Sequence, residues 1–539
     1  MTRRREQARG CGWRRLLGAA VLAWSGLATA AAPGLPPAVL SALERAQLPP
    51  EALVAYVAEL GPQGAFPPRL AHRAQQPVNP ASLMKLYTTG AALELLGPAW
   101  TWSTPVLANG PVIDDVLQGD LVLQGRGDPT LTIERVWLLL RQLQQRGIRE
   151  VRGDIVLDGS AFMLPPANPA DFDGEPLKPY NVRPDALLLN YKSITLGLRP
   201  EPPNGVARVS TDVALAGVSV DASVPLVAGA CGDWRGALEL DFSDPARLRL
   251  AGRYPAACGE KTWPLAYSEA RSYNARLLES MWREIGGRIG GRVREGSTPP
   301  GAQTLFEVTS PPLAAVVRDI NKYSNNVMAE QLFLSLAYSQ TAAARASTTA
   351  AIAAIAALAE PPPAAASGAG AAASTVAGAA ETSSVTAANA SRPGVVHSDQ
   401  LARELVAGQV RLRTGCSEAE LVVDNGSGLS RHSRSSARCL AAWLQALWAS
   451  PVMPELMSSL PVPGIDGTTR RPGRHWGAAL GRAHLKTGSL RDTAGVAGYV
   501  LAASGRRYAL VAIVNHAQAS AARPVLDALV QWAAEDTGR

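Results

Sequence analysis

Ser82 and Lys85 lie three residues apart in a segment, residues 79–96, whose composition is typical of a buried helix. Pro80 suits the start of a helix and Gly97 suits the position after its end, so both residues fall in the first turn. Side chains at i and i+3 share one helical face about 5–6 Å apart, so an amine and a hydroxyl there can form a hydrogen bond. Burial favours the uncharged form of a lysine. The pair therefore predicts a serine nucleophile that is deprotonated by a neutral lysine.

The scarcity of lysine strengthens this prediction, because the spacing alone fits an exposed helix lysine equally well. Six lysines stand among the 52 Lys and Arg residues, which leaves 46 arginines. Only Lys85 has a serine three residues before it. Arginine is essentially never deprotonated in proteins, so it could not replace lysine as the base.

The C-terminal region predicts the layer on which the Ser82 helix packs. Strands are expected over Ala483 to Ser489, Ala494 to Ala502 and Arg507 to Val514, followed by a helix over Pro524 to Ala533. An apolar run over residues 53–57 adds a strand before the Ser82 helix. Three antiparallel strands and a helix need a partner layer, so the two ends of the chain are expected to form one α/β domain.

The middle of the chain predicts an insertion. Short strand-like runs at residues 120–123, 153–157, 206–210 and 237–242 are separated by turns, with one helix over Ile133 to Gln145. Helical periodicity returns over residues 267–285 and 311–336, with a break at residues 323–326. Residues 341–396 are rich in Ala, Ser, Thr and Gly, and 360–393 have too few large apolar groups to repay the cost of ordering.

Residues 1–30 have the pattern of a secretory signal peptide, with arginines before an apolar run and small residues at the expected cleavage site. This leader holds six arginines and one glutamate, a net of +5, so about +2 of the formal +7 belongs to the rest of the chain. Such a small charge gives little support to nucleic-acid binding.

Four cysteines remain after the leader: Cys231, Cys258, Cys416 and Cys439. An even number in an exported chain predicts disulfides, and four cysteines allow three connectivities. We favour pairing of the near neighbours in sequence, Cys231 with Cys258 and Cys416 with Cys439. No Cys-x-x-Cys or His-x-x-x-His pattern occurs, so we expect neither a metal site nor a cofactor.

Two further motifs follow the Ser82-x-x-Lys85 motif in order, Ser324-x-Asn326 and Lys486-Thr487-Gly488. Together they are the three motifs of penicillin-binding proteins and serine β-lactamases. The intervals between them are 242 and 162 residues by subtraction, and a compact β-lactamase has no room for the first.

The whole mature chain resembles the D-alanyl-D-alanine carboxypeptidase/endopeptidases, the class C low-molecular-mass penicillin-binding proteins of peptidase family S13. The likeness includes residues 184–190 (PDALLLN), 424–431 (DNGSGLSR) and 460–468 (LPVPGIDGT). It implies an α/β (α+β) fold in which a transpeptidase-like domain, an antiparallel sheet flanked by helices, is interrupted by a mainly β insertion of two domains. We expect the catalytic domain over 31–103 and 263–539, and the insertion over 104–262.

The resemblance also implies roles for the motif residues. Ser82 attacks the peptide carbonyl, Lys85 is the base, and the backbone N–H groups of Ser82 and Ser489 hold the oxyanion. Ser324 is expected to relay a proton to the leaving amine, and Asn326 to contact the substrate amide. Lys486 and Thr487 are expected to bind the terminal carboxylate, and Gly488 to allow close approach to the backbone. The residues expected to recognise the diamino-acid side chain are Asp158, Phe162 and Arg431. The ordinary interpretations of Asp158 and Arg431 are a turn aspartate and an ion-pair arginine.

The expected function is a serine DD-peptidase of peptidoglycan, a penicillin-sensitive hydrolase that cleaves terminal D-Ala-D-Ala and peptide cross-bridges. Its expected partners are stem peptides, cross-bridges and β-lactams as covalent inhibitors, and we expect a periplasmic protein, soluble or peripheral, without a transmembrane anchor. The number of subunits is left open. The alternatives are a β-lactamase and a non-catalytic wall-binding protein. Slow deacylation would argue against the β-lactamase. The wall-binding protein is disfavoured by the intact set of motif residues, Ser82, Lys85, Ser324 and Lys486.

Overall fold

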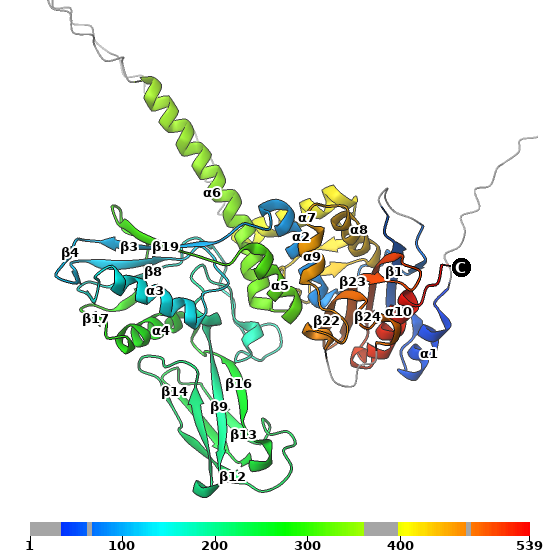
Figure 1. The fold of residues 1–539 in the computed structure, drawn as a ribbon, viewed down its shortest axis with the longest axis horizontal. Coiled ribbons are helices and arrows are strands. Elements are labelled where there is room, and N and C mark those ends of the chain that lie inside the picture. The colour runs from blue at the N-terminus through cyan, green and yellow to red at the C-terminus, as the bar shows by residue number, and fades with distance from the viewer. Residues whose placement is uncertain (1–33, 62–66, 360–396, 471–475, 539) are drawn as a thin grey trace, which may run out of the picture.

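The computed structural model describes residues 34–61, 67–359, 397–470 and 476–538. For residues 344–359 it describes the backbone alone. The expected signal peptide over 1–30 lies outside the described residues. The helix α6 (Asn326–Ala359) extends into the Ala/Ser-rich segment expected over 341–396, and residues 360–396 of that segment also lie outside the described part. Figure 1 shows α6 projecting away from the two lobes of the molecule.

The main domain is built from both ends of the chain around one antiparallel sheet. In spatial order its strands are β2 (Leu70–His72), β1 (Leu53–Glu59), β24 (Arg507–Asn515), β23 (Thr493–Leu501) and β22 (Ala483–Leu490). β1 pairs along its whole length with β24, with Leu53 opposite Val514. The three C-terminal strands and the expected joining of the two ends of the chain in one layer are confirmed.

Helices cover both faces of this sheet (Figure 1). Alternate residues of β24 point to opposite faces, as the pleat requires: Val511 and Ile513 join one core, while Leu510, Ala512 and Val514 join the other. The first core takes residues from α2, α5, α6, α7 and α8, and the second from α1 and α10. The helices of this domain besides α6 are α1 (Pro37–Arg45), α2 (Met84–Leu96), α5 (Leu313–Tyr323), α7 (Ser398–Thr414), α8 (Ala437–Trp448), α9 (Met453–Ser459) and α10 (Arg523–Ala534).

The helix α2 is buried on all sides over most of its length, as expected for a helix that is apolar all round. Gly97 ends it with a φ of 80°, a conformation that glycine adopts without strain. Gly90 allows close packing on α8, because a Cβ there would lie 2.6 Å from Leu447 and 2.9 Å from Trp443. Trp443 Nε1 also donates to Leu86 O at 3.0 Å. The helix that carries Lys85 is thus held rigidly in the centre of the main domain.

The insertion forms the other lobe in Figure 1 and contains several small sheets around one apolar core. The expected helix α3 (Ile133–Gln145) and strands near residues 120, 155, 206 and 238 are confirmed. Besides α3, its helices and strands are β3 (Ser103–Asn109), β4 (Val112–Ile113), β5 (Val116–Leu117), β6 (Asp120–Gln124), β7 (Glu150–Val151), β8 (Ile155–Asp158), β9 (Ser193–Glu201), β10 (Val206–Thr211), β11 (Ser219–Val220), β12 (Ser223–Val227), β13 (Leu238–Asp241), β14 (Arg247–Gly252), β15 (Tyr254–Pro255), β16 (Lys261–Ala266), α4 (Ala270–Glu284), β17 (Arg288–Ile289), β18 (Val293–Glu295) and β19 (Gln303–Thr309).

Strands that follow the expected boundary at residue 262 pair with strands of the insertion. β19 pairs antiparallel with β3, and β18 pairs with β8, so strands after residue 262 complete the sheets of the insertion. Tyr273 and Trp282 of α4 are buried in the same core. Because these elements bury their apolar groups within the insertion, we propose that it runs from Ser103 to Thr309.

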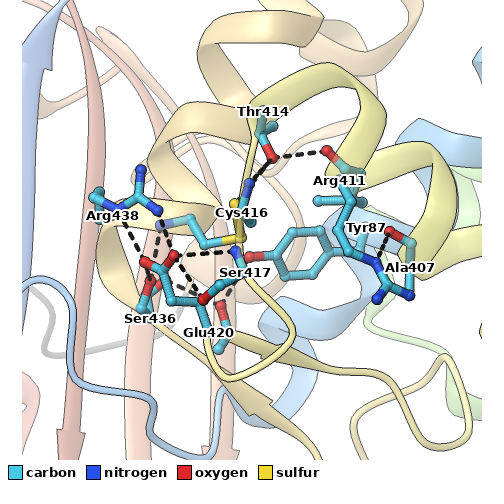
Figure 2. Close-up of a disulfide and its surroundings, with 12 residues drawn as sticks. Tyr87, Ala407, Arg411, Thr414, Cys416, Ser417, Glu420, Ser436 and Arg438 are labelled. Atoms are coloured by element: carbon cyan, nitrogen blue, oxygen red, sulfur yellow. Dashed lines mark hydrogen bonds and ion pairs between the residues drawn. A yellow bond between two sulfur atoms is a disulfide. The ribbon is translucent and has the colours of Figure 1, made fainter.

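Two disulfides join Cys231 to Cys258 and Cys416 to Cys439, the pairing favoured from the sequence. Figure 2 shows the second bridge beside Glu420, whose Oε1 accepts hydrogen bonds from Arg438 Nε and Ser436 Oγ, each at 2.9 Å. The bridge ties the end of α7 to the first turn of α8. It therefore closes a loop, residues 417–438, that includes the DNGSGLSR segment.

Removing this second bridge is expected to lower the free energy of unfolding of the main domain by about 3 kcal/mol, because the unfolded chain gains the entropy of a loop whose ends are 23 residues apart. Calorimetry of the Cys416→Ala/Cys439→Ala variant measures the loss as a lower transition temperature. The matched control is Cys231→Ala/Cys258→Ala, whose bridge has a similar separation of 27 but lies in the insertion. An equal shift of the main-domain transition in both variants would contradict the prediction that the Cys416–Cys439 bridge stabilises the main domain.

Candidate active site

Ser82 lies at the mouth of α2, in a 3-10 turn, Ala81–Leu83, that leads into the helix. Ala81 has a φ of 48°, a left-handed conformation that costs a non-glycine residue roughly 1–2 kcal/mol. Asn79 Oδ1 accepts a hydrogen bond from Ala81 N at 2.9 Å. Asn515 on β24 holds Asn79 in turn, accepting from its N–H at 2.8 Å and donating to its carbonyl at 3.0 Å. The sheet therefore fixes the turn that presents Ser82.

Three oxygen atoms surround the buried amine of Lys85. Its Nζ lies 3.1 Å from Ser82 Oγ, 2.6 Å from Asn326 Oδ1 and 2.6 Å from Ser427 O. A neutral amine has two N–H groups and one lone pair. The two shorter contacts are to acceptors that can only receive these N–H groups, so the lone pair faces the Ser82 hydroxyl. The geometry suits proton transfer from serine to lysine.

The charge state of Lys85 fits this role. The side chain is fully buried, and burial lowers the pKa of Lys85 to about 7, although the charge of Glu330 acts in the opposite direction. A base with a pKa near the working pH is both unprotonated and basic enough to accept a proton. The predicted neutral lysine is therefore available around pH 7.

The second motif occupies the break between α5 and α6. Ser324 ends α5 with a φ of 57°, and Asn326 begins α6, so the two side chains leave the backbone at a sharp change of direction. Ser324 Oγ accepts a hydrogen bond from Lys486 Nζ at 2.7 Å. Asn326 reaches Lys85 through its Oδ1, which leaves its Nδ2 group as the one that can donate to a substrate. Strained backbone of this kind is common at functional sites.

The third motif lies on β22, the edge strand of the sheet, beside the Ser82 turn. A Cβ at Gly488 would lie 2.9 Å from Pro80 O and 3.2 Å from Ser82 N, so glycine allows the strand and the turn to approach this closely. N–H groups alternate in direction along a strand, and Leu485 N donates away from β23 to Pro461 O. The N–H of Ser489, four residues on, therefore points to the same outer edge, as an oxyanion donor beside Ser82 requires.

Lys486 brings a second buried amine to the site. Its Nζ donates to Ser324 Oγ and to Thr487 O, each at 2.7 Å. Burial, reinforced by the positive charge of Lys85, holds the pKa of Lys486 well below its usual range. The neighbouring Thr487 hydroxyl shares a hydrogen bond with Thr468 at 2.8 Å.

Residues of the first two motifs, and Ser489 next to the third, line one cleft with a volume of about 1160 Å³. Arg431 lies in its wall, with its guanidinium over the Phe172 ring at 4.7 Å and 3.4 Å from Asp492. The insertion also contributes to the cleft through Thr195, Asp212 and Pro264. The cleft thus spans the main domain and the insertion, and its walls include Ser82, Ser324, Asn326, Arg431 and Ser489.

Asp158 and Phe162 lie outside the set of residues that line this cleft. Asp158 is buried at the end of β8, where its carboxylate accepts from Ser160 N at 3.0 Å and Thr298 N at 2.9 Å. Phe162 is partly buried against the core of the main domain. Of the three residues expected to recognise a diamino-acid side chain, the structure places Arg431 alone with Ser82.

Several residues of the site were not expected from the sequence. The carbonyl of Ser427 contacts Lys85, Glu330 is buried behind Ser427, and Lys322 donates to Asp466 and to Leu460 O, each at 2.6 Å. A backbone carbonyl has no sequence signature. Lys322, in contrast, is one of only six lysines, so the argument applied to Lys85 could have identified it.

Comparisons with known proteins agree on one family. The family model described as "D-Ala-D-Ala carboxypeptidase 3 (S13) family" matches residues 55–360 and 381–536. D-alanyl-D-alanine carboxypeptidase DacB of Haemophilus influenzae is 23% identical over 443 residues, 81% of this chain and 80% of that protein. The D-alanyl-D-alanine carboxypeptidase of Actinomadura sp. (strain R39) is 27% identical over 487 residues, 85% of this chain and 77% of that protein.

The fold is also similar to a solved structure. The crystal structure of penicillin binding protein 4 (dacB) from Haemophilus influenzae has a TM-score of 0.67 at 21% identity, covering 92% of this chain and 98% of the other. A second structure of that protein, in complex with a β-lactam, has a TM-score of 0.63 at 20% identity, over 92% and 99% of the two chains. This likeness confirms the expected penicillin-binding protein fold.

Proposed function

Because the chain belongs to the D-Ala-D-Ala carboxypeptidase 3 (S13) family, we propose that it is a serine DD-peptidase that works through an acyl-enzyme on Ser82. The observation that carries the assignment of residues is the 3.1 Å contact between Ser82 Oγ and Lys85 Nζ. The cleft beside Ser82 is also lined by Ser324 and Asn326 of the second motif and by Ser489, which follows the third motif. Two relatives of the chain are named D-alanyl-D-alanine carboxypeptidases, which supports the proposed DD-peptidase reaction.

Acylation begins when Ser82 Oγ attacks the carbonyl carbon of the D-Ala-D-Ala bond. The hydroxyl proton passes to the lone pair of Lys85, and the carbonyl electron pair moves onto oxygen. The N–H groups of Ser82 and Ser489 then stabilise the oxyanion. Asn326 Nδ2 orients the substrate amide, so the reacting carbon stays above Ser82.

Collapse of the tetrahedral intermediate needs a proton for the leaving amine. Ser324 is the relay, since its hydroxyl accepts from Lys486 Nζ at 2.7 Å and can pass its own proton onward. Lys486 and Thr487 also provide the amine and the hydroxyl that bind the terminal carboxylate. Exchange with solvent then removes the proton that Lys85 took and returns one to Lys486, so Lys85 is neutral again. Water attacks the acyl-enzyme with Lys85 as base, and the shortened peptide is released.

The proposed substrates are peptidoglycan stem peptides and their cross-bridges. A cleft of about 1160 Å³ exceeds the roughly 300–1,000 Å³ of a typical small-molecule site, and the insertion contributes to its wall. This space supports endopeptidase action on a branched cross-bridge besides carboxypeptidase action. β-Lactams are proposed as covalent inhibitors at Ser82, which the β-lactam complex of the similar penicillin binding protein 4 supports.

We also propose that the protein is exported and acts in the periplasm. The leader expected over residues 1–30 supports this, as do the two disulfides, which form in oxidising compartments. Within the part of the chain that the structure describes, we find no helix long and apolar enough to cross a membrane.

Mass spectrometry of the products tests the proposed substrates. The purified protein is incubated separately with a monomeric muropeptide that ends in D-Ala-D-Ala and with a D-Ala-cross-linked dimer. We expect the monomer to lose one D-alanine and the dimer to yield two monomers. Unchanged muropeptides alongside rapid, repeated hydrolysis of penicillin would contradict the proposal and favour the β-lactamase alternative.

A further inference from the structure

Glu330 is a buried acid that the mechanism above does not use. It lies on α6 one turn after Asn326, so the two side chains share a face of the helix. Glu330 Oε1 accepts a hydrogen bond from Ser427 Oγ at 2.9 Å, and the carbonyl of the same Ser427 accepts from Lys85 Nζ at 2.6 Å. Ser427 therefore links the acid to the base, through its side chain on one side and its backbone on the other.

We propose that Glu330 is a positioning residue that stabilises the ammonium group formed when Lys85 takes the proton of Ser82. In that step the O–H bond of Ser82 breaks, an N–H bond forms on Lys85, and the Oγ electron pair bonds to the substrate carbonyl carbon. A positive charge then appears on a fully buried amine, where it is costly unless an opposite charge lies near. The inference rests on the proposed role of Lys85 as the base.

The hydrogen bonds of Ser427 fit an acid that changes its protonation state. Ser427 Oγ accepts from Leu429 N at 3.1 Å and lies within range of two acceptors, Glu330 Oε1 at 2.9 Å and Asn425 Oδ1 at 3.1 Å. A hydroxyl has one proton, so it serves Glu330 when that carboxylate is charged. When Glu330 is protonated it can donate to Ser427, which then donates to Asn425. Both states are satisfied without movement of the heavy atoms.

The electrostatics support the same link. Burial raises the pKa of Glu330 to about 7, while the Ser427 hydrogen bond and the charges of Arg183 and Lys85 lower it. Lys85 and Glu330 therefore titrate in the same pH range, and a charge on one favours the opposite charge on the other. The remaining charged or titratable groups that face this pair or line the adjoining pocket are Lys486, Asp424, Asp399, Arg403, Arg431, Asp171, Tyr180 and His432.

The test is the pH dependence of acylation by benzylpenicillin in the Glu330→Gln variant. Glutamine keeps the shape and can still bond to Ser427, but it carries no charge. Because the charge of Glu330 raises the pKa of Lys85, we expect the acid limb of the acylation rate to move to lower pH by about half a unit or more. The rate above the limb falls, since a weaker base accepts the proton less readily.

Glu94→Gln is the matched control, because Glu94 is a partly buried glutamate on α2 itself, paired with Arg413 at 3.2 Å. We expect this variant to keep the wild-type profile. Ser427→Ala is a second test: it removes the side-chain hydrogen bonds of Ser427, including the one to Glu330, and leaves the backbone carbonyl in place. Its acid limb should move in the same direction by less. If Glu330→Gln does not fold, Ser427→Ala decides.

The outcomes separate this inference from the proposed function. If the wild type shows an acid limb and neither Glu330→Gln nor Ser427→Ala shifts it, the role of Glu330 is overturned. The Ser82 mechanism would remain intact in that case. An equal shift in Glu94→Gln would also overturn it, because the effect would not be specific to Glu330. Absence of any acylation of Ser82 in the wild type would refute the proposed function itself.

Discussion

Replacing Ser82 with alanine is expected to abolish covalent labelling by penicillin and to lower kcat/KM for D-alanine release by about 10⁴-fold or more. The loss is large because alanine has no atom that can form the acyl-enzyme, whereas the remaining oxyanion donors give only residual catalysis. Labelling is measured by the mass of the intact protein, and release by a D-alanine assay. The fold should be unchanged, because Ser82 is only half-buried at the mouth of the cleft.

Ser458→Ala is the control for this variant. Ser458 is an exposed serine on α9 whose hydroxyl bonds to the nearby Glu455 O at 3.1 Å, outside the cleft. Its variant should be labelled at the wild-type rate. A penicillin adduct that persists in folded Ser82→Ala protein would show that another residue is the nucleophile.

Replacing Lys85 with arginine is expected to slow acylation by between about 10²- and 10⁴-fold, the usual contribution of a general base. Arginine keeps hydrogen-bond donors at this position but is permanently charged, because its guanidinium is not deprotonated in proteins. The variant therefore separates a basic role of Lys85 from a purely structural ion or hydrogen-bond role. The measurement is the second-order rate constant for acylation by benzylpenicillin.

Lys322→Arg is a useful comparison, since Lys322 is also buried and lies at the end of α5, where it pairs with Asp466 rather than with a nucleophile. Its variant tests the cost of placing arginine in a buried lysine site near the cleft. We expect a much smaller loss than in Lys85→Arg. Equal losses in both variants would indicate that disturbed packing, not loss of the base, explains the effect.

The sequence predicted those parts of the fold that have strong local signals. The Ser82 helix is apolar all round, α3 has apolar periodicity, and each has glycine at or just after its end. The strands β22 to β24 are apolar runs separated by short turns. The order of the three motifs then placed Ser82, Ser324 and Lys486 in one site. In the structure Lys85 Nζ contacts Ser82 Oγ at 3.1 Å and Asn326 Oδ1 of the second motif at 2.6 Å. Lys486 Nζ contacts Ser324 Oγ at 2.7 Å, which joins the third motif to the second.

Features that depend on distant partners were not predictable in the same way. β3 and β19 are joined by pairing between residues about 200 positions apart, with Thr309 opposite Ser103, and no local pattern encodes that pairing. The insertion that we propose, Ser103 to Thr309, is therefore longer than its composition indicated. The helix α1 was missed although Val39, Ala42 and Leu43 have helical spacing after Pro37, so its signal was present in the sequence.

The contacts that tune Lys85 belong to the same class of long-range features. Ser427 lies in the DNGSGLSR segment, and its carbonyl reaches Lys85, a residue 342 positions away. Glu330 is an ordinary residue in a helical pattern until α6 is placed against the 424–431 loop. The fold determines which charged groups are buried beside Lys85, so the effect of Glu330 on the pKa of Lys85 can be recognised only in the structure.

The most direct test of the central claim, that an uncharged Lys85 takes the proton of Ser82, is the pH dependence of wild-type acylation. The second-order rate constant with benzylpenicillin is measured from about pH 5 to pH 9, on both sides of the usual range for a perturbed lysine. Lys85 is charged below its pKa, so the rate should rise about tenfold per pH unit and level off above a pKa of about 7. A rate that does not change with pH across this range, or a limb that survives unchanged in Lys85→Arg, would contradict the account.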